Sequence, residues 1–171
     1  MNTSPYRFTL RRSMVDRPRR PLGVTMVNPS TASEVFVSDA ASNDNTIRSL
    51  IRIAEYNGFD GLVVTNLSPY KATDPVELVE AIRAGKDVFA AGDGSHIVEM
   101  ARLCEVIVCA WGTAAGRHPA LEARASAVRA LLLEHKPVIH CFGRTKDGWP
   151  KHPLFLARET KIIPWATRGT A

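Results

Sequence analysis

Polar side chains with the chemistry to bind a ligand follow the four most apolar stretches of the chain. These polar segments are Asn28–Ala32, Asn66–Lys71, Trp111–Thr113 and Gly143–Pro153. Together they carry amide, indole, ammonium and imidazole groups, which hydrogen-bond to, stack on and charge-pair with small organic molecules. The segments indicate a binding cleft, provided that the fold brings them to one place.

The stretches that precede these segments have the length and composition of β-strands. They are Leu22–Val27, Leu62–Thr65, Val106–Ala110 and Val138–Phe142. Unbroken apolarity is typical of short strands that are covered on both faces, as in a parallel sheet under helices. The pair Ile162–Ile163 predicts an edge strand near the C-terminus. The alternation over Tyr6–Leu10 predicts another half-buried strand, also at an edge.

Helical periodicity fills the intervals between these strands. Apolar residues recur at helical spacing over residues 47–54, 97–104 and 121–132. Asp44 and Asp74 are placed to cap two helices, Gly58 to end one and Pro119 to open the longest. The alternation of strands and helices predicts one α/β domain over residues 1–171, a three-layer sandwich with a central, mostly parallel sheet.

This architecture gives the polar segments a common location. Ligands of open α/β sheets bind beyond the carboxyl ends of the strands, and every polar segment follows such an end. We therefore expect Asn28, Asn66 and His152 to converge on one pocket.

Each candidate also has a purely structural explanation. Asn28 before Pro29 either closes a turn or holds a water or a substrate hydroxyl. Asn66 either caps a loop or presents its amide, a donor and an acceptor together, to the edge of a base. His152 is either an exposed turn residue or a donor to a developing anion. Trp111 is either a wall or a stacking platform.

A second polar cluster extends the first loop. Residues 42–46 hold more polar side chains than a helix cap requires, with Asn43 and Thr46 on either side of Asp44. If the loop after Asn28 folds over the cleft, Asp44 is a carboxylate in the site.

Composition and missing motifs narrow the function classes. The histidines lack metal-ligand spacing, and phosphate-loop, dinucleotide-binding and nucleophile-elbow motifs are absent, so we expect no metal and no cofactor.

Cys104, Cys109 and Cys141 are interpreted as buried thiols of a reducing compartment. With no membrane-length apolar run and no apolar signal region, we expect a cytoplasmic protein without a membrane partner. A net charge of +5 is compatible with a phosphate-bearing partner, and the oligomeric state stays open.

The same residues carry a family resemblance over nearly the whole chain. The motifs are Tyr6-x-Phe8-x-Leu10, Asn28–Ala32, Asn43-Asp44-x-Thr46-Ile47-Arg48, Asn66-Leu67, Trp111-Gly112 and Thr145-Lys146-x-Gly148-x-Pro150-x-His152-Pro153-Leu154. In this order they resemble the family called domain of unknown function 1643. That resemblance implies no activity.

A second resemblance implies chemistry. Val27–Ser30, Val64–Leu67 and His152-Pro153 are similar, in order and approximate spacing, to motifs of the uracil-DNA glycosylase superfamily, which has a three-layer α/β fold. By this resemblance Asn28 positions a water, Asn66 reads the base edge and His152 stabilises the departing base. The chain departs from that pattern at Leu154, where the superfamily has a phosphate-binding serine.

The remaining candidates take roles around this scheme. Asp44 is the carboxylate nominated as general base, and Trp111 or Tyr70 would stack on the base. Lys146 and Lys151 would contact phosphate. Pro29, Ser30, Asn43 and Thr46 would complete the binding site.

These inferences lead to a nucleobase-recognising protein whose partner is a nucleic acid or a nucleoside. The reaction we expect is hydrolysis of the N-glycosidic bond of an altered base in nucleic acid. One alternative is a non-catalytic module that binds a nucleotide or nucleic acid in the same cleft. The other is an enzyme that acts on free nucleosides. A continuous basic groove would favour a polymer, and a closed pocket would favour the small molecule.

Overall fold

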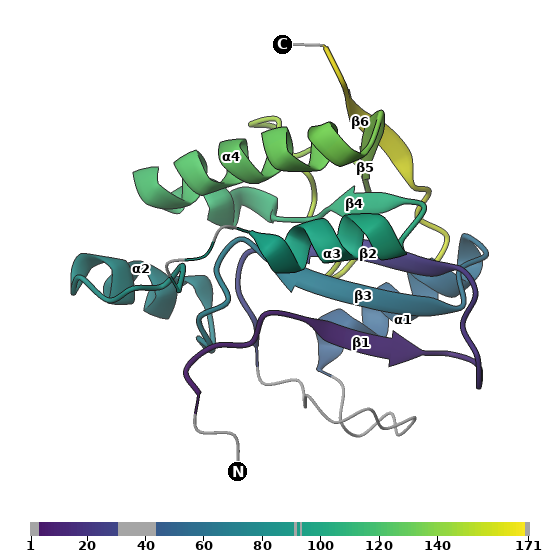
Figure 1. Cartoon of the computed structure of the whole chain (residues 1–171), viewed down its shortest axis with the longest axis horizontal. Coiled ribbons are helices and arrows are strands. Elements are labelled where there is room, and N and C mark those ends of the chain that lie inside the picture. The colour runs from purple at the N-terminus through teal and green to yellow at the C-terminus, as the bar shows by residue number, and fades with distance from the viewer. Residues whose placement is uncertain (1–3, 31–43, 91, 93, 170–171) are drawn as a thin grey trace.

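The computed structural model describes residues 4–30, 44–90, 92 and 94–169, and the chain forms a layered α/β structure (Figure 1). Its strands are β1 (Leu10–Ser13), β2 (Pro21–Met26), β3 (Gly61–Asn66), β4 (Ile107–Cys109), β5 (Val138–Cys141) and β6 (Ile163–Thr167). Its helices are α1 (Asn45–Tyr56), α2 (Pro75–Arg83), α3 (Ser95–Leu103), the 3₁₀ helix η2 (Gly112–Arg117) and α4 (Pro119–His135).

The six strands form one sheet in the order β1-β3-β2-β4-β5-β6. The inner strands β3, β2, β4 and β5 run parallel, whereas β1 and β6 pair antiparallel at the two edges. The expected α/β class is confirmed, but the sheet is mixed rather than mostly parallel. The connection from β1 to β2, residues 14–20, and the connection from β5 to β6, residues 142–162, contain no crossover helix, and a parallel pair needs such a crossover.

Helices cover both faces of the sheet and make two separate cores. The core under α1 contains Leu22, Val24 and Leu50, and the core under α2, α3 and α4 contains Met100, Ile107 and Leu132. From β2 the chain crosses to β3 in one direction, and from β3 it then crosses to β4 and β5 in the other. Crossovers of one hand in opposite directions must use opposite faces, which explains why α1 lies alone on its side (Figure 1).

Local signals fix the helix ends as the sequence predicts. Asp44 caps α1 by accepting from the backbone N–H of Ile47, and Gly58 follows that helix with φ +80°. Asp74 caps α2 by accepting from the N–H groups of Val76 and Glu77. Such caps satisfy amides that have no partner within the helix.

The N-terminal edge strand differs from its prediction. The strand spans Leu10–Ser13, and Tyr6 makes only an isolated bridge to Tyr70. The alternation over Tyr6–Leu10 is misleading because Arg7 is buried while Phe8 is 42% exposed. The Arg7 N–H donates to the carbonyl of Pro69, so this segment follows a loop rather than a strand.

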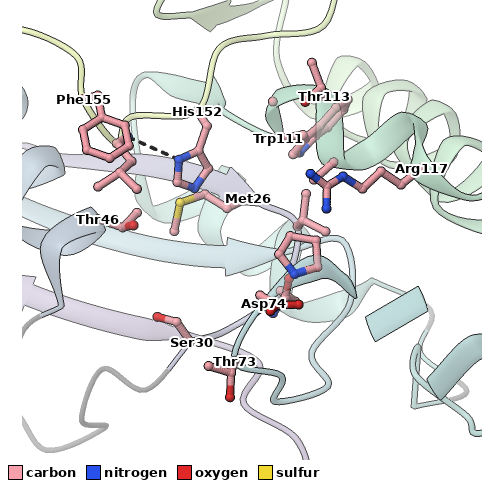
Figure 2. A pocket seen from close by; sticks show the side chains of 16 residues that line it. Met26, Ser30, Thr46, Thr73, Asp74, Trp111, Thr113, Arg117, His152 and Phe155 are labelled. Atoms are coloured by element: carbon pink, nitrogen blue, oxygen red, sulfur yellow. Dashed lines mark hydrogen bonds between the residues drawn. The ribbon is translucent and has the colours of Figure 1, made fainter. Parts of the chain in front are cut away.

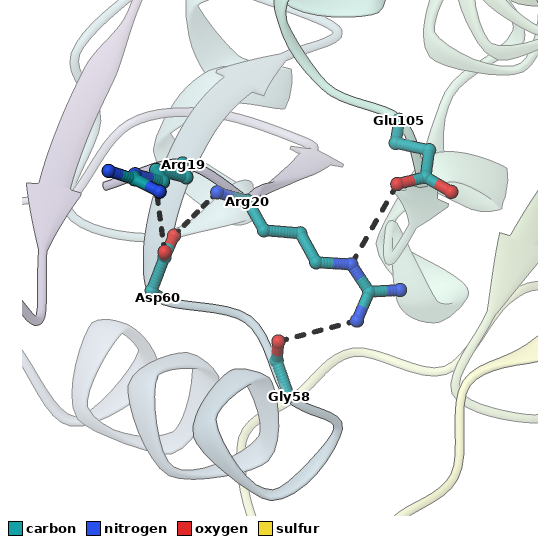
Figure 3. A network of polar contacts seen from close by, with 5 residues as sticks. All are labelled: Arg19, Arg20, Gly58, Asp60 and Glu105. Carbon is teal, nitrogen blue, oxygen red and sulfur yellow. Dashed lines mark hydrogen bonds and ion pairs between the residues drawn. The ribbon is translucent and has the colours of Figure 1, made fainter. Parts of the chain in front are cut away.

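Hydrogen bonds to the Asp60 carboxylate hold the amino ends of β2 and β3 together (Figure 3). The Asp60 carboxylate accepts from the backbone N–H groups of Arg19 at 2.9 Å and Arg20 at 2.8 Å. These bonds, the Arg19 amide foremost, lower the pKa of Asp60 below its ordinary value. The Arg20 side chain reaches the Gly58 carbonyl and Glu105. The arginine- and proline-rich segment that leads into β2 is therefore anchored at its end.

Among the residues that the structure describes, no helix is both long and apolar enough to cross a membrane.

Close packing around Gly23 in β2 predicts that substitutions at Gly23 and Ile107 are coupled in their effect on stability. A Cβ on Gly23 would lie 2.5 Å from Cδ1 of Ile107 and 3.1 Å from Cγ of Met100. We expect Gly23→Ala to lower the free energy of unfolding by about 1–3 kcal/mol, because this core has no room for a methyl group. Ile107→Val removes the obstructing Cδ1, so the double variant should be more stable than the sum of the two losses predicts. Urea denaturation measures all three variants, and additive losses would contradict this account of the packing.

Candidate active site

A cavity of about 560 Å³ opens at the carboxyl ends of β2 and β4. The helices that follow these neighbouring strands cover opposite faces of the sheet, α1 on one face and α4 on the other. The cavity is lined by Met26, Val27, Asn28, Ser30, Thr46, Thr73, Asp74, Pro75, Trp111, Gly112, Thr113, Ala114, Arg117, His152, Leu154 and Phe155 (Figure 2). Its position is the place where open α/β sheets bind ligands.

Asn28 enters the cavity directly from the end of β2 with a fixed amide. Its Nδ2 donates to the carbonyl of Ala72 at 2.9 Å and to that of Pro29 at 3.3 Å. The Ala72 N–H in turn donates to Pro29, which ties this loop to the one before α2. With both Nδ2 hydrogens engaged, Oδ1 is the atom left to accept a hydrogen bond from a ligand or a water.

His152 reaches the cavity through a loop that folds back after β5. The Lys151 N–H donates to the carbonyl of Gly143, and the Gly112 N–H donates to that of Pro150 at 2.7 Å. Gly112 has φ +63°, and a Cβ there would lie 3.0 Å from the Cβ of His152. Glycine at this position therefore lets the end of β4 approach the histidine closely.

The protonation state of His152 follows from its contacts. Its Nδ1 accepts from the Leu154 N–H at 3.2 Å, as Figure 2 shows. Burial lowers the pKa of His152 below its ordinary value of 6.5, and the negative charge of Asp44 opposes this effect in part. The imidazole is therefore neutral at pH 7 with its proton on Nε2, which makes Nε2–H a donor.

Two carboxylates lie at the cavity, and they are not equivalent. Both oxygens of Asp44 accept hydrogen bonds, Oδ1 from the Ile47 N–H and Oδ2 from the Ser30 hydroxyl, and Ser30 in turn lines the cavity. Asp74 lines the cavity itself. Its Oδ1 holds the cap of α2, and within the described part of the chain Oδ2 has no hydrogen-bond partner.

Aromatic side chains form the cavity wall and its rim. Trp111 is fully buried and packs edge-on against Trp165, so it forms a wall. Phe155 is 94% exposed and has φ +67°. A left-handed backbone at a non-glycine residue costs about 1–3 kcal/mol, and such strain gathers at functional sites.

Among the described residues that line the cavity, one carries a guanidinium group. Arg117 ends η2 and extends into the cavity on the side of Asp74 in Figure 2. Over the ranges that the structure describes, Arg117 forms no ion pair. An uncommitted guanidinium presents a flat fork of donors that matches a phosphate or carboxylate.

A comparison with known families covers most of this chain. Residues 7–154 match the family model described as protein of unknown function (DUF1643). The chain belongs to this family. No curated protein and no solved structure matches it. The predicted DUF1643 membership is therefore confirmed, while the resemblance to the uracil-DNA glycosylase superfamily gains no support from these comparisons.

The DUF1643 fold brings together some of the predicted residues. Asn28, Ser30, Thr46, Trp111 and His152 line the cavity, and Asp44 contacts it through Ser30. Pro29 is buried beneath the lining, where its carbonyl holds the Asn28 amide. Asn43 lies outside the described residues.

Other predicted residues lie away from the cavity. Asn66 is 3% exposed at the end of β3, on the far side of β2 from β4. The expected convergence is thus found for Asn28 and His152 and not for Asn66. Tyr70 packs against Tyr6 beside a different groove. The exposed side chains of Lys146 and Lys151 belong to the loop after β5 and do not line the cavity.

The cavity also contains residues that sequence reasoning missed. The sequence predicts that Asp74 caps a helix and gives it no catalytic role, and it does not single out Arg117. The signal for Asp74 lay in its distance from Asn66, because only one short loop separates them and loops after strands line such clefts. Nothing in the sequence marked Arg117.

Metal and thiol chemistry have no visible basis in the part of the chain that the structure describes. No group of three histidine, cysteine, aspartate or glutamate side chains is arranged to hold a metal ion there. Cys104, Cys109 and Cys141 are buried free thiols, and burial raises the pKa of Cys104 to about 11. A buried thiol with a raised pKa is a poor nucleophile at neutral pH.

The lowered pKa of His152 predicts an acid-sensitive contribution to stability. Below pH 6.5 the unfolded chain binds the proton more readily than the folded chain does, so the free energy of unfolding should fall as pH falls from 7 toward the lowered pKa. His152→Gln should make this decline shallower. Urea denaturation at several pH values measures it, and His135→Gln is the control because His135 is exposed at the end of α4. An unchanged slope in His152→Gln would contradict the assignment.

Proposed function

We propose that the cavity binds a nucleobase-bearing ligand and hydrolyses its N-glycosidic bond. The observation that carries this proposal is that Asn28 and His152 line the same cavity. In each side chain one nitrogen, Nδ2 of Asn28 or Nδ1 of His152, is hydrogen-bonded to the backbone. Asn28 offers an acceptor, Oδ1, and His152 offers a donor, Nε2–H. Hydrolysis of an N-glycoside needs both, one for the water and one for the departing base.

The proposed reaction replaces the bond between C1′ and the base with a bond between C1′ and a water oxygen. The bond between C1′ of the sugar and the base nitrogen breaks, and its electron pair leaves with the base. Water adds its oxygen to C1′, and its proton ends on the base, which gives a free sugar hydroxyl and a neutral base. Asn28 Oδ1 accepts a hydrogen bond from this water and orients it, which replaces a chance encounter with a positioned one.

His152 acts on the departing base. Negative charge that leaves with the base spreads onto its carbonyl oxygen, where Nε2–H donates a hydrogen bond. A donor placed in advance at a developing anion lowers the barrier more than the same contact does in water. The neutral imidazole that follows from the lowered pKa of His152 is suited to this task, because it donates a hydrogen bond without carrying a charge into the cavity.

Asp74 acts on the sugar. As the bond breaks, the sugar becomes cation-like, and a carboxylate near it stabilises that charge. Asp74 is the lining carboxylate with a free oxygen, whereas both oxygens of Asp44 are engaged. We therefore assign this stabilising role to Asp74, and we assign no step to Asp44, which the sequence predicts to be the general base.

A second candidate function is binding without turnover. The observation that favours it is that both carboxylates at the cavity cap helices, so each has at least one oxygen withdrawn from chemistry. A site that only binds needs no water-activating group. The two candidates share the ligand and differ in whether the base is released.

Base release and binding are tested on the same panel. The probes are nucleosides, nucleotides and single-stranded oligonucleotides that carry ordinary bases, uracil or hypoxanthine, with chromatography for the free base and calorimetry for affinity. We expect His152→Ala to lower kcat/KM by roughly 10²–10³-fold, the typical loss of a donor to a developing anion. Asn28→Ala should lower kcat/KM by roughly 10²-fold through the loss of water positioning.

The controls are His135→Ala and Asn45→Ala, which remove the same side-chain types from exposed positions. Circular dichroism establishes that each variant is folded. Affinity without base release would support the binding candidate over the hydrolase. If no probe binds or reacts, or the controls lose as much as the site variants, the proposed function is wrong.

A further inference from the structure

The cavity has two chemically different sides. Figure 2 shows Phe155 beside His152 on one side and Arg117 on the opposite side, with Asp74 below them and nearer to Arg117. The first side offers a flat aromatic ring and a hydrogen-bond donor. The second offers a guanidinium. A ligand that uses both sides must itself have an aromatic part and an anionic part.

Phe155 has the features of a ring-binding residue. Its side chain is 94% exposed although it lines the cavity, so almost nothing of this protein packs on the ring. The backbone holds it there with φ +67°, a conformation that glycine would adopt more easily. Exposed aromatic faces of this kind stack on flat ligands, and stacking tolerates any base because every base has a π-face.

Arg117 has the features of a phosphate-binding residue. It is exposed in the cavity, it forms no ion pair over the described ranges, and the Thr113 hydroxyl from the same helix η2 also lines the cavity. A guanidinium binds phosphate through two parallel hydrogen bonds, and a hydroxyl adds a third donor.

The remaining charges favour a small ligand over a polymer. A nucleic-acid backbone is followed by several cations in a row. In this cavity Arg117 is the basic side chain of the lining, and Lys146 and Lys151 lie outside it. A volume of about 560 Å³ falls in the range of small-molecule sites.

We propose that the ligand is a free nucleoside monophosphate, with its base between His152 and Phe155, its sugar at Asp74 and its phosphate on Arg117. This inference rests on the proposed function, because it takes the nucleobase from there and adds the phosphate and the free state of the ligand.

The test separates the phosphate from the base. Calorimetry compares four probe types: 5′-monophosphates of adenosine, guanosine, cytidine, uridine and inosine, the matching nucleosides, ribose 5-phosphate, and a single-stranded oligonucleotide of the same bases. We expect at least one monophosphate to bind about tenfold or more tightly than its nucleoside, as a charge-assisted bidentate contact predicts. Arg117→Ala should abolish that advantage and leave the nucleoside affinity unchanged.

Phe155 is tested by the opposite pattern. Phe155→Ala should weaken nucleoside and monophosphate alike by about threefold to tenfold, which is the range for one stacking contact. It should leave ribose 5-phosphate unchanged, and Phe155→Trp should restore binding. Phe155→Gly should weaken binding while raising the melting temperature, because glycine relieves the left-handed backbone. Arg102→Ala, an exposed arginine on α3, is the matched control for Arg117→Ala.

The contrary outcomes are distinct. Equal affinity for a nucleoside and its monophosphate would overturn the phosphate site and leave the proposed function standing. An oligonucleotide that binds more tightly than every monophosphate would overturn the free ligand. If no base-bearing probe binds, both this inference and the proposed function fail.

Discussion

The divergence of the chain at the ends of β2 and β4 is the constraint on which the rest of this structure depends. These neighbouring strands are parallel, yet the helices that follow them, α1 and α4, cover opposite faces of the sheet. The cavity lies at the ends of the two strands, where the chain changes from one face to the other. Asn28 and Trp111 line it because each follows one of the two diverging strands.

Backbone hydrogen bonds then orient the groups that face this space. Asn28 gives both amide hydrogens to the loops around it, and His152 gives its Nδ1 lone pair to the Leu154 N–H. What remains is one acceptor and one donor of defined direction. Ordering these side chains costs conformational entropy during folding, so little of that cost is left when a ligand binds. The strained backbone of Phe155 fits the same account, because part of the stability of the fold is given up at the site.

Local structure was predictable from the sequence because its signals are local. Patterns within a few residues predict the inner strands and the caps Asp44 and Asp74. A general property of α/β sheets, that ligands bind at the carboxyl ends of the strands, predicts that Asn28 and His152 line one cavity. Strand order is not a local property. Because β3 pairs on the far side of β2, Asn66 and Tyr70 are withdrawn from the cavity although they follow a strand as Asn28 does.

The omissions have the same physical origin. Arg117 acquires meaning only when η2 is seen to border the cavity, and Asp74 only when its loop is seen tied to Asn28 through Ala72. The mixed character of the sheet also escaped prediction. Its edge strands are short, and β1 carries the polar Arg11, Arg12 and Ser13, so periodicity identifies it poorly.

The imidazole nitrogens of His152 offer the most direct test of the central claim, that a neutral histidine presents Nε2–H to a ligand in this cavity. Long-range ¹H–¹⁵N correlation spectra at pH 7, assigned with His152→Gln, report which nitrogen carries the proton. The account predicts a neutral ring protonated on Nε2, with resonances that shift when a nucleoside monophosphate is added to saturation. A charged ring, a proton on Nδ1, or chemical shifts that stay unchanged when each base-bearing probe is added would contradict it.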